Sequence, residues 1–166
     1  MRNKPAVPDR IIGELERIRK DVPGVRGGIT ASSDGLLIAH DVRGIEPTQV
    51  AALVSAMHAV AARAAVSTQC GQFKEVITRG SEGYLAVYAA GSTAVVAVLG
   101  TADLNLAMLN FHARAMIEHI AEHSAQLTGG RSAAGAASAS TSGPASAPEA
   151  GQRDAGRLPG RRPRAT

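Results

Sequence analysis

The two histidines near residue 120 have the spacing of a metal-binding pair. His119 and His123 flank Glu122 in the pattern H-x-x-E-H, and residues four apart share one face of a helix. Zinc-dependent hydrolases combine such a pair with a glutamate base and a third protein ligand. After His123 the only acids are Glu149 and Asp154, which lie in a stretch that we expect to be disordered. A solvated helix end therefore explains the pair better than a metal site, and the hypothesis of a small metallohydrolase rests on this pattern alone.

Other signatures of catalysis are missing from the sequence. It contains no G-x-x-x-x-G-K-[ST] phosphate-binding loop, so we do not expect the chain to be a GTPase itself. No serine sits in a G-x-S-x-G turn, and the single Cys70 has no base beside it in the sequence. We predict that the chain is not an enzyme and that it holds no catalytic residue, cofactor or metal.

A helix predicted over residues 48–66 is apolar almost all the way round. A surface helix has one apolar stripe, whereas a helix that is apolar on every side must be enclosed. The stretch is shorter and more polar than a membrane span, which needs about 20 apolar residues, so we expect no transmembrane segment. We expect the chain's own sheet to cover one side of this helix and a second subunit to cover the other. The only polar residues of the helix are Thr48, Gln49, Ser55, His58 and Arg63.

Turn residues and hydrophobic periodicity divide the rest of the chain into short elements. Ile11, Leu15 and Ile18 fall on one helical stripe behind Asp9, a good N-cap residue. Tight turns join neighbouring strands, which therefore pair antiparallel. We predict helices over residues 10–21, 48–66 and 103–127, with Asp103 opening the last, and strands over residues 25–31, 36–40, 73–78, 84–89 and 93–99.

These elements predict an α+β fold, of the broad α/β class, in the order α-β-β-α-β-β-β-α. It has a five-stranded, mainly antiparallel sheet with helices on both faces. Residues 94–99 are uninterrupted apolar sequence, so their strand should be central. Lys74 and Glu75 bring charge to a strand that should lie at the edge. The first and last helices should cover one face, and helix 48–66 the other.

The excess positive charge lies at the C-terminal end of the chain. Residues 1–130 carry 12 Lys and Arg against 12 Asp and Glu, whereas residues 131–166 carry 6 Arg against 2 acids. From residue 128 onward the sequence is Ala, Ser, Gly, Pro and Arg, with too little apolar surface to offset the entropy of ordering. We predict one domain over residues 8–127 and a disordered tail over residues 128–166.

Composition also bounds the partners and the location of the chain. Only two Phe, two Tyr and no Trp occur, so stacking platforms for bases are scarce and we expect no specific nucleic acid partner. The first ten residues contain no apolar run of the kind that a signal peptide needs. With a single cysteine there is no intrachain disulfide. We therefore expect a cytoplasmic protein.

Five segments in this order and spacing resemble the roadblock family, also called the dynein light-chain roadblock superfamily. No segment is diagnostic alone, but together they are fairly specific, and the resemblance runs from about residue 10 to residue 123. The segments are Val22-Pro23-Gly24-Val25-Arg26-Gly27, Ser33-Asp34-Gly35-Leu36, the Ala-rich helix 50–66, Gly83-Tyr84-Leu85-Ala86-Val87 and residues 95–99.

The resemblance implies a homodimer in which the central helices lie side by side and the third strands pair across the interface into one sheet. Bacterial members resemble partners of small Ras-like GTPases, and many are similar to the second component of operons that also encode a sensor kinase and a GTPase. The long Arg-containing tail departs from the family. The expected dimer contacts are Val50, Leu53, Val54, Met57, Val60, Ala61, Phe73, Glu75 and Ile77.

Our leading hypothesis is a homodimeric regulator or scaffold of a Ras-like GTPase. We expect Gln49, Ser55, His58 and Arg63 to be exposed on the paired helices and to hold the switch segments of the GTPase in a hydrolysis-ready arrangement. Two residues of this helix have alternative interpretations. Arg63 is either an arginine finger or, as is more usual for an arginine on a helix, a solvated residue at the rim, and His58 is either a pH sensor or, more commonly, a neutral, hydrogen-bonded histidine.

An alternative hypothesis is an adaptor that docks a sensor histidine kinase or an anionic surface through its tail. Arginine side chains attract phosphate groups, and such binding weakens steeply with salt. A short basic tail is more often simply solvated. The residues concerned are Arg157, Arg161, Arg162 and Arg164.

Overall fold

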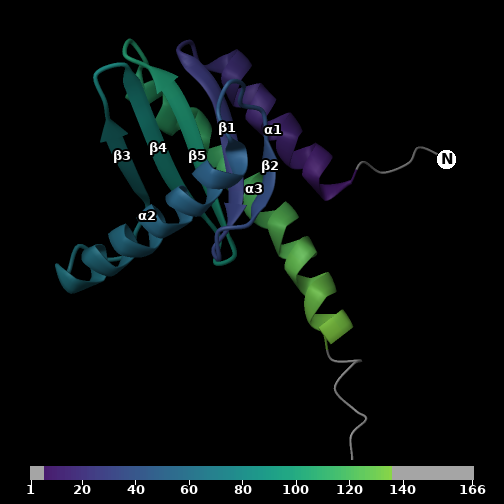
Figure 1. Cartoon of the computed structure of the whole chain (residues 1–166). Helices are drawn as coiled ribbons and strands as arrows, with labels where there is room; N and C mark the ends of the chain where they lie inside the picture. The colour runs from purple at the N-terminus through teal and green to yellow at the C-terminus, as the bar shows by residue number, and fades with distance from the viewer. Residues whose placement is uncertain (1–5, 136–166) are drawn as a thin grey trace, which may run out of the picture.

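The predicted order of elements is confirmed by the computed structural model, which describes residues 6–135, with side chains to residue 126 (Figure 1). The fold is the expected α+β arrangement of three helices and five strands. The elements are α1 (Val7–Asp21), β1 (Val25–Ser32), β2 (Leu37–His40), α2 (Pro47–Ser67), β3 (Glu75–Arg79), β4 (Gly83–Ala90), β5 (Ala94–Thr101) and α3 (Leu106–Gly135).

The five strands form one antiparallel sheet in the order β2-β1-β5-β4-β3. β5 lies at its centre, as the uninterrupted apolar run predicted, because both of its faces are covered. β3, which begins at Glu75, lies at one edge, as its charge predicted. Within residues 6–135, no strand therefore pairs with β3 on the side away from β4.

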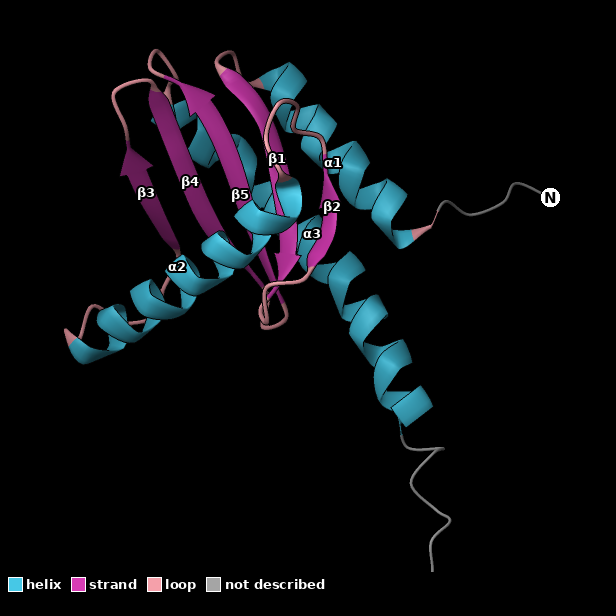
Figure 2. Ribbon diagram, in the orientation of Figure 1, coloured by secondary structure: helices cyan, strands magenta, loops and turns pink. Residues whose placement is uncertain are grey.

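Helices cover the two faces of the sheet unequally (Figure 2). α1 and α3 pack together on one face, where Ile11, Leu15, Leu109 and Ile120 are fully buried. α2 lies alone on the other face, above a smaller core that includes Val54. The predicted division of the helices between the faces is confirmed, and the face under α2 has the thinner cover.

The helices α1 and α3 begin at other residues than predicted. α1 starts at Val7 because Pro8 suits the first helical turn, so Asp9 lies inside the helix and is not its cap. α3 starts at Leu106, where Asn105 Oδ1 accepts a hydrogen bond from the Met108 backbone N–H at 3.1 Å. Asp103 instead accepts a hydrogen bond from Thr101 Oγ1 at 2.5 Å.

α3 also continues to Gly135, past its predicted end at residue 127. Residues 128–135, which the sequence predicted to be disordered, are therefore helical in the structure, and the predicted domain boundary stays a prediction. Nucleating a helix is costly, but extending an existing one adds one hydrogen bond for each residue fixed, so poor helix formers can follow a long helix. The rest of the predicted tail, residues 136–166, lies outside the described residues.

A buried carboxylate fastens the loop between β2 and α2 to the sheet. Asp41 Oδ1 accepts a hydrogen bond from the Gly28 N–H at 2.6 Å, and Asp41 Oδ2 lies 3.0 Å from Arg19 Nε in an ion pair. The Arg19 N–H is not aligned for a hydrogen bond. The Asp41 side chain is 5% exposed, so water cannot replace these contacts. A Cβ at Gly27 would lie 3.0 Å from Val42 Cγ1, which shows how closely the loop approaches β1.

We predict that Asp41→Ala lowers the free energy of unfolding by about 2 kcal/mol, because the Gly28 N–H loses its acceptor and the Arg19 guanidinium loses its ion-pair partner. Asp21→Ala is the matched control, since Asp21 forms only an exposed ion pair with Arg17 at 3.6 Å. That control should cost less than about 0.5 kcal/mol. Urea unfolding at one fixed protein concentration measures both. Equal losses in the two variants would contradict the role given to Asp41.

Candidate interaction surface

The inner side of α2 is held on the sheet. The helix begins with Glu46, whose side chain accepts a hydrogen bond from the Thr48 N–H at 3.2 Å. Ala51 and Val54 are fully buried against the sheet. The Ser55 hydroxyl donates a buried hydrogen bond to the Ser32 carbonyl at 2.9 Å. These contacts fix both the position of α2 and its rotation about its own axis.

The outer side of α2 is apolar and open. Leu53, Val60 and Val66 are 58%, 69% and 71% exposed, respectively. Exposed alanines at positions 52, 56, 59 and 64 lie between them. We call these seven residues the α2 outer face. No other part of residues 6–135 covers it, so the expectation that the sheet covers only one side of the helix is confirmed.

The two halves of α2 have different surroundings. All three buried residues of α2, Ala51, Val54 and Ser55, lie in its amino-terminal half. From Ala59 to Ser67 none is buried, and Figure 1 shows this end of the helix extending past β3. At 1.5 Å per residue the overhang is about 13 Å long. An apolar helix end therefore projects beyond the open edge of the sheet.

α2 is also long and apolar enough to cross a membrane by length and composition, the one such helix in the described part of the chain. The expectation that it is too short for a span is therefore wrong, since it has 21 residues. A helix that packs in a protein core passes the same test. Val54 and Ser55 pack α2 onto the sheet, so in this structure it is a layer of the domain.

The structure separates the residues predicted to form dimer contacts. Leu53 and Val60 lie on the α2 outer face, and Glu75 is exposed on β3. Val54 is not available to a partner, because its side chain is completely buried in the core under α2. Its assignment to an interface is wrong. Ile77 packs against the other core, between the sheet and the helices α1 and α3. The remaining four, Val50, Met57, Ala61 and Phe73, are half-buried.

The four residues predicted to contact a partner do not form one surface. Gln49 and Arg63 are exposed, as expected. Ser55 is not, because it is 4% exposed and its hydroxyl is bound to the sheet, so this prediction is wrong. His58 is half-buried, with its ring edge-on to Phe73 at a centroid distance of 5.1 Å. Burial lowers the pKa of His58 below its usual value, since desolvation disfavours the imidazolium.

A chain of hydrogen bonds fixes the start of β3 from the opposite face. The Tyr88 hydroxyl donates to Asn110 Oδ1 at 2.6 Å, and Asn110 Nδ2 donates to Glu75 Oε1 at 2.9 Å. Burial, and secondarily the charge of Glu75, raise the pKa of the Tyr88 hydroxyl. The chain joins β4, α3 and β3. Sequence reasoning missed Asn110, because a single polar residue in a helix gives no signal of which strand it will meet.

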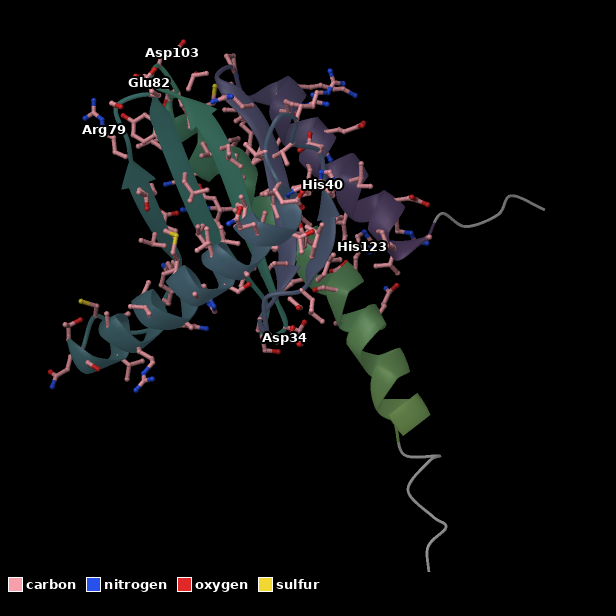
Figure 3. All side chains as sticks on the ribbon, in the orientation of Figure 1. Asp34, His40, Arg79, Glu82, Asp103 and His123 are labelled. Atoms are coloured by element: carbon pink, nitrogen blue, oxygen red, sulfur yellow. The ribbon has the colours of Figure 1, made fainter. Side chains whose placement is uncertain are left out.

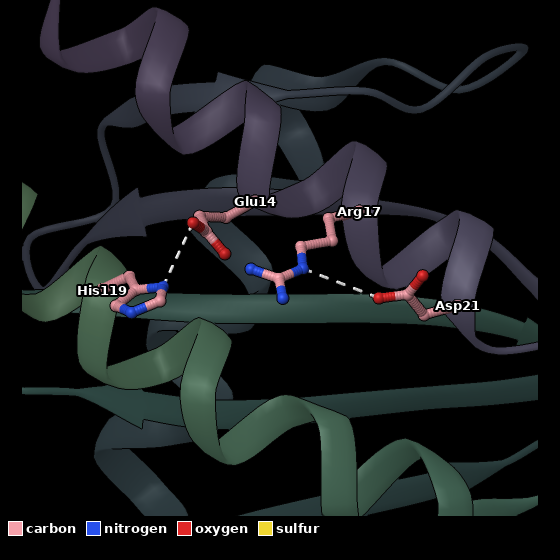
Figure 4. A network of polar contacts seen from close by, with 4 residues as sticks. All are labelled: Glu14, Arg17, Asp21 and His119. Carbon is pink, nitrogen blue, oxygen red and sulfur yellow. Dashed lines mark hydrogen bonds and ion pairs between the residues drawn. The ribbon is translucent and has the colours of Figure 1, made fainter.

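The histidine pair of α3 is not assembled as a metal site. His119 Nδ1 lies 3.1 Å from Glu14 Oε1 of α1 (Figure 4). His123, labelled in Figure 3, has a buried Nδ1 without a hydrogen-bond partner in the described part of the chain. Among residues whose side chains are described, no three His, Cys, Asp or Glu gather as metal ligands would. In the structure, His119 contributes a polar contact between α3 and α1.

We predict that acidification weakens the fold through His58. Because its pKa is lowered in the folded state, the unfolded chain binds the proton first, and stability is lost as the pH falls through 6.5. Between pH 7.5 and pH 5.5 the urea midpoint of the wild type should fall further than that of His58→Gln. His112→Gln controls for the loss of an imidazole from the other face of the sheet. An equal fall in His58→Gln and the wild type would contradict the prediction.

The fold also occurs in solved structures of other proteins, at low sequence identity. MglB from Myxococcus xanthus is 17% identical, with a TM-score of 0.66 over 76% of this chain and 96% of that chain. An MglB with a tetrameric arrangement is 19% identical, with a TM-score of 0.67 over 75% and 94% of the two chains. A Roadblock/LC7 domain from Streptomyces avermitilis is 22% identical, with a TM-score of 0.60 over 66% and 92%.

Comparison of the sequence itself gives the family. No curated protein matches the chain. The family model of the Roadblock/LC7 domain matches residues 11–100, more than half of the chain. The matched part contains α2, the strands β1 to β4 and all of β5 except Thr101. This match agrees with the resemblance seen in the sequence and with the observed fold. The chain belongs to the Roadblock/LC7 family.

Proposed function

We propose that this chain is a homodimeric, non-enzymatic regulator or scaffold of a small Ras-like GTPase in bacterial signalling, and that it acts in the cytoplasm. The observation that carries the proposal is the α2 outer face, an uncovered apolar surface on a Roadblock/LC7 domain. Contiguous exposed apolar surface of this kind marks a protein contact. The MglB of known structure with a tetrameric arrangement is consistent with self-association in this fold.

A second copy of the chain suits both open features of the domain. Two copies related by a twofold axis at the β3 edge can pair their edge strands, since no strand of the described part of the chain lies beside β3 on the side away from β4. The same axis brings the overhanging end of each α2 over the sheet of the other copy. Val60 and Val66 then leave water, and both helices lie side by side.

The paired helices would form the platform for the GTPase. Gln49 and Arg63 are exposed there, and His58 lies at the margin beside Phe73. A platform that binds the switch segments of a GTPase better in one conformation shifts their population toward it. Hydrolysis then rises if the favoured conformation is the reactive one. Arg63 serves in this account as a binding residue and not as an arginine finger, because it lies on the helix surface among small apolar residues.

An adaptor function through the basic C-terminal end is the second candidate. The observation that favours it is that the whole positive excess of the sequence lies after residue 130. Arginines there would attract a sensor histidine kinase or an anionic surface through charge. Removal of residues 136–166 should abolish such recruitment and leave dimer formation unchanged.

We predict that the wild type has the mass of a dimer in light scattering at micromolar concentration. Val60→Lys should shift it to monomer, because a charge would have to be buried in the contact between helices. Met108→Lys is the matched control, since Met108 is exposed on the opposite face. A monomeric wild type, or a dimer that Val60→Lys leaves intact, would contradict the proposed assembly.

We predict that the small GTPase encoded nearest to the gene of this chain binds the dimer. A regulator raises single-turnover GTP hydrolysis of that GTPase, and a scaffold binds without changing the rate. Arg63→Ala tests the platform, and its effect should appear in affinity more than in the rate of the bound complex. If Arg63→Ala removed the stimulation of GTP hydrolysis and left the affinity for the GTPase unchanged, Arg63 would instead be an arginine finger. No binding by the wild type would contradict the proposed function.

A further inference from the structure

A shallow pocket opens at the end of the sheet where β1 begins, on the face that carries α2. Its volume is about 280 Å³, and its walls are Arg26, Val42, Arg43, Ile45 and Leu99. Val42 and Leu99 pack against the core that α2 covers, so the pocket and the helix share one face of the molecule. We call these five residues the Arg26–Arg43 pocket.

A β-bulge positions the first arginine. Val25 pairs with Gly100 and Gly27 pairs with Leu99, so Arg26 is an extra residue without a partner on β5. Such a bulge redirects the side chain of the extra residue. Arg26 is the one exposed residue of a strand that is otherwise buried. Its guanidinium is therefore available at the rim of the pocket.

The anchored loop before α2 positions the second arginine. Asp41 is fixed to Gly28 and Val42 packs over Gly27, which brings the next residues of the loop beside β1. Arg43 is exposed, and Ile45 is 37% exposed. The loop is thus held at its start by a buried carboxylate and at its end by the first turn of α2.

Neither arginine of the pocket has an acidic partner in the described part of the chain. The salt bridges there involve Arg17, Arg19, Lys20 and His119 only. The two acids of the same loop have other partners, since Asp41 is bound to Gly28 and Arg19, and Glu46 accepts a hydrogen bond from the Thr48 N–H. Two unpaired guanidiniums thus stand beside the exposed apolar edge of Ile45.

We propose that the Arg26–Arg43 pocket receives an aspartate or glutamate side chain of the GTPase, next to an apolar side chain that covers Ile45. The proposal rests on the proposed function and adds the chemistry of one contact. Guanidinium groups bind carboxylates through paired, charge-assisted hydrogen bonds. A protein carboxylate suits the pocket better than an anionic membrane, because membrane-binding segments carry clusters of about 4 to 8 cations.

The pocket stays open in the proposed dimer. The overhang of α2 is about 13 Å long. Neighbouring strands are about 4.8 Å apart, so this overhang covers two to three strands of the other copy, counted from β3. β1 is fourth from that edge, after β3, β4 and β5. Each pocket therefore lies beside the paired helices, where a bound GTPase would reach it.

The test is a charge reversal with a matched control. The pocket variant carries both Arg26→Glu and Arg43→Glu. The control variant carries both Lys20→Glu and Arg114→Glu, which change the net charge by the same amount at exposed positions on the face of α1 and α3. The probe is the small GTPase encoded nearest to the gene of this chain, loaded with a non-hydrolysable GTP analogue. Calorimetric titrations at low and high salt give the affinity, and light scattering and urea unfolding check dimer and fold.

The pocket variant should bind the GTPase at least about tenfold more weakly than the control variant, with a smaller dependence on salt. An acidic residue of the GTPase exchanged for lysine should restore its binding. Affinity equal to that of the control would overturn the pocket contact and leave the proposed function standing. No binding by the wild type would overturn both. Loss of binding to phosphatidylglycerol vesicles, with GTPase affinity unchanged, would assign the pocket to a membrane and overturn the proposal.

Discussion

The apolar character of α2 on both of its sides is the constraint on which the structure depends. One side supplies Ala51 and Val54 to the core on that face of the sheet, and it cannot turn outward without exposing that core. The other side carries Leu53, Val60 and Val66 into water. The free energy of that exposed surface falls only when another surface covers it. The inner side of α2 is therefore part of the core of the domain, and its outer side remains available for association.

One face of the sheet holds most of the hydrophobic core, and the other carries the surfaces proposed for association. α1 and α3 close one face over the larger core, in which Leu15, Leu109 and Ile120 are buried. The other face keeps a single helix, an open strand edge and the Arg26–Arg43 pocket. Asp41 links the two, because its carboxylate joins Arg19 of α1 to the loop that carries Arg43. A substitution at Asp41 would thus release the loop that carries Arg43 from α1 and β1.

Most of the fold was predictable from the sequence, because local patterns determine it. The uninterrupted run 94–99 identified the central strand, and Lys74 and Glu75 identified the edge. Element boundaries were less predictable. Pro8 can occupy the first helical turn as well as precede it, and residues 128–135 follow a helix that is already formed.

The candidate site was predictable only in outline. The sequence identified α2 as the contact element but not its rotation on the sheet, and so it assigned Val54 and Ser55 to the wrong side. An all-round apolar helix has no polar stripe to show which side faces inward. Arg26 gave no signal, because its exposure comes from a bulge whose register depends on β5, more than 70 residues further along the chain.

The central claim is that a second copy of the chain covers the outer side of α2. Isotope-filtered nuclear Overhauser spectroscopy on a mixture of labelled and unlabelled protein tests it most directly. The account predicts contacts between the methyl groups of Val60 and Val66 in a labelled subunit and protons of an unlabelled one. The absence of such contacts at a concentration where the protein is dimeric would contradict it, because the dimer would then use another surface.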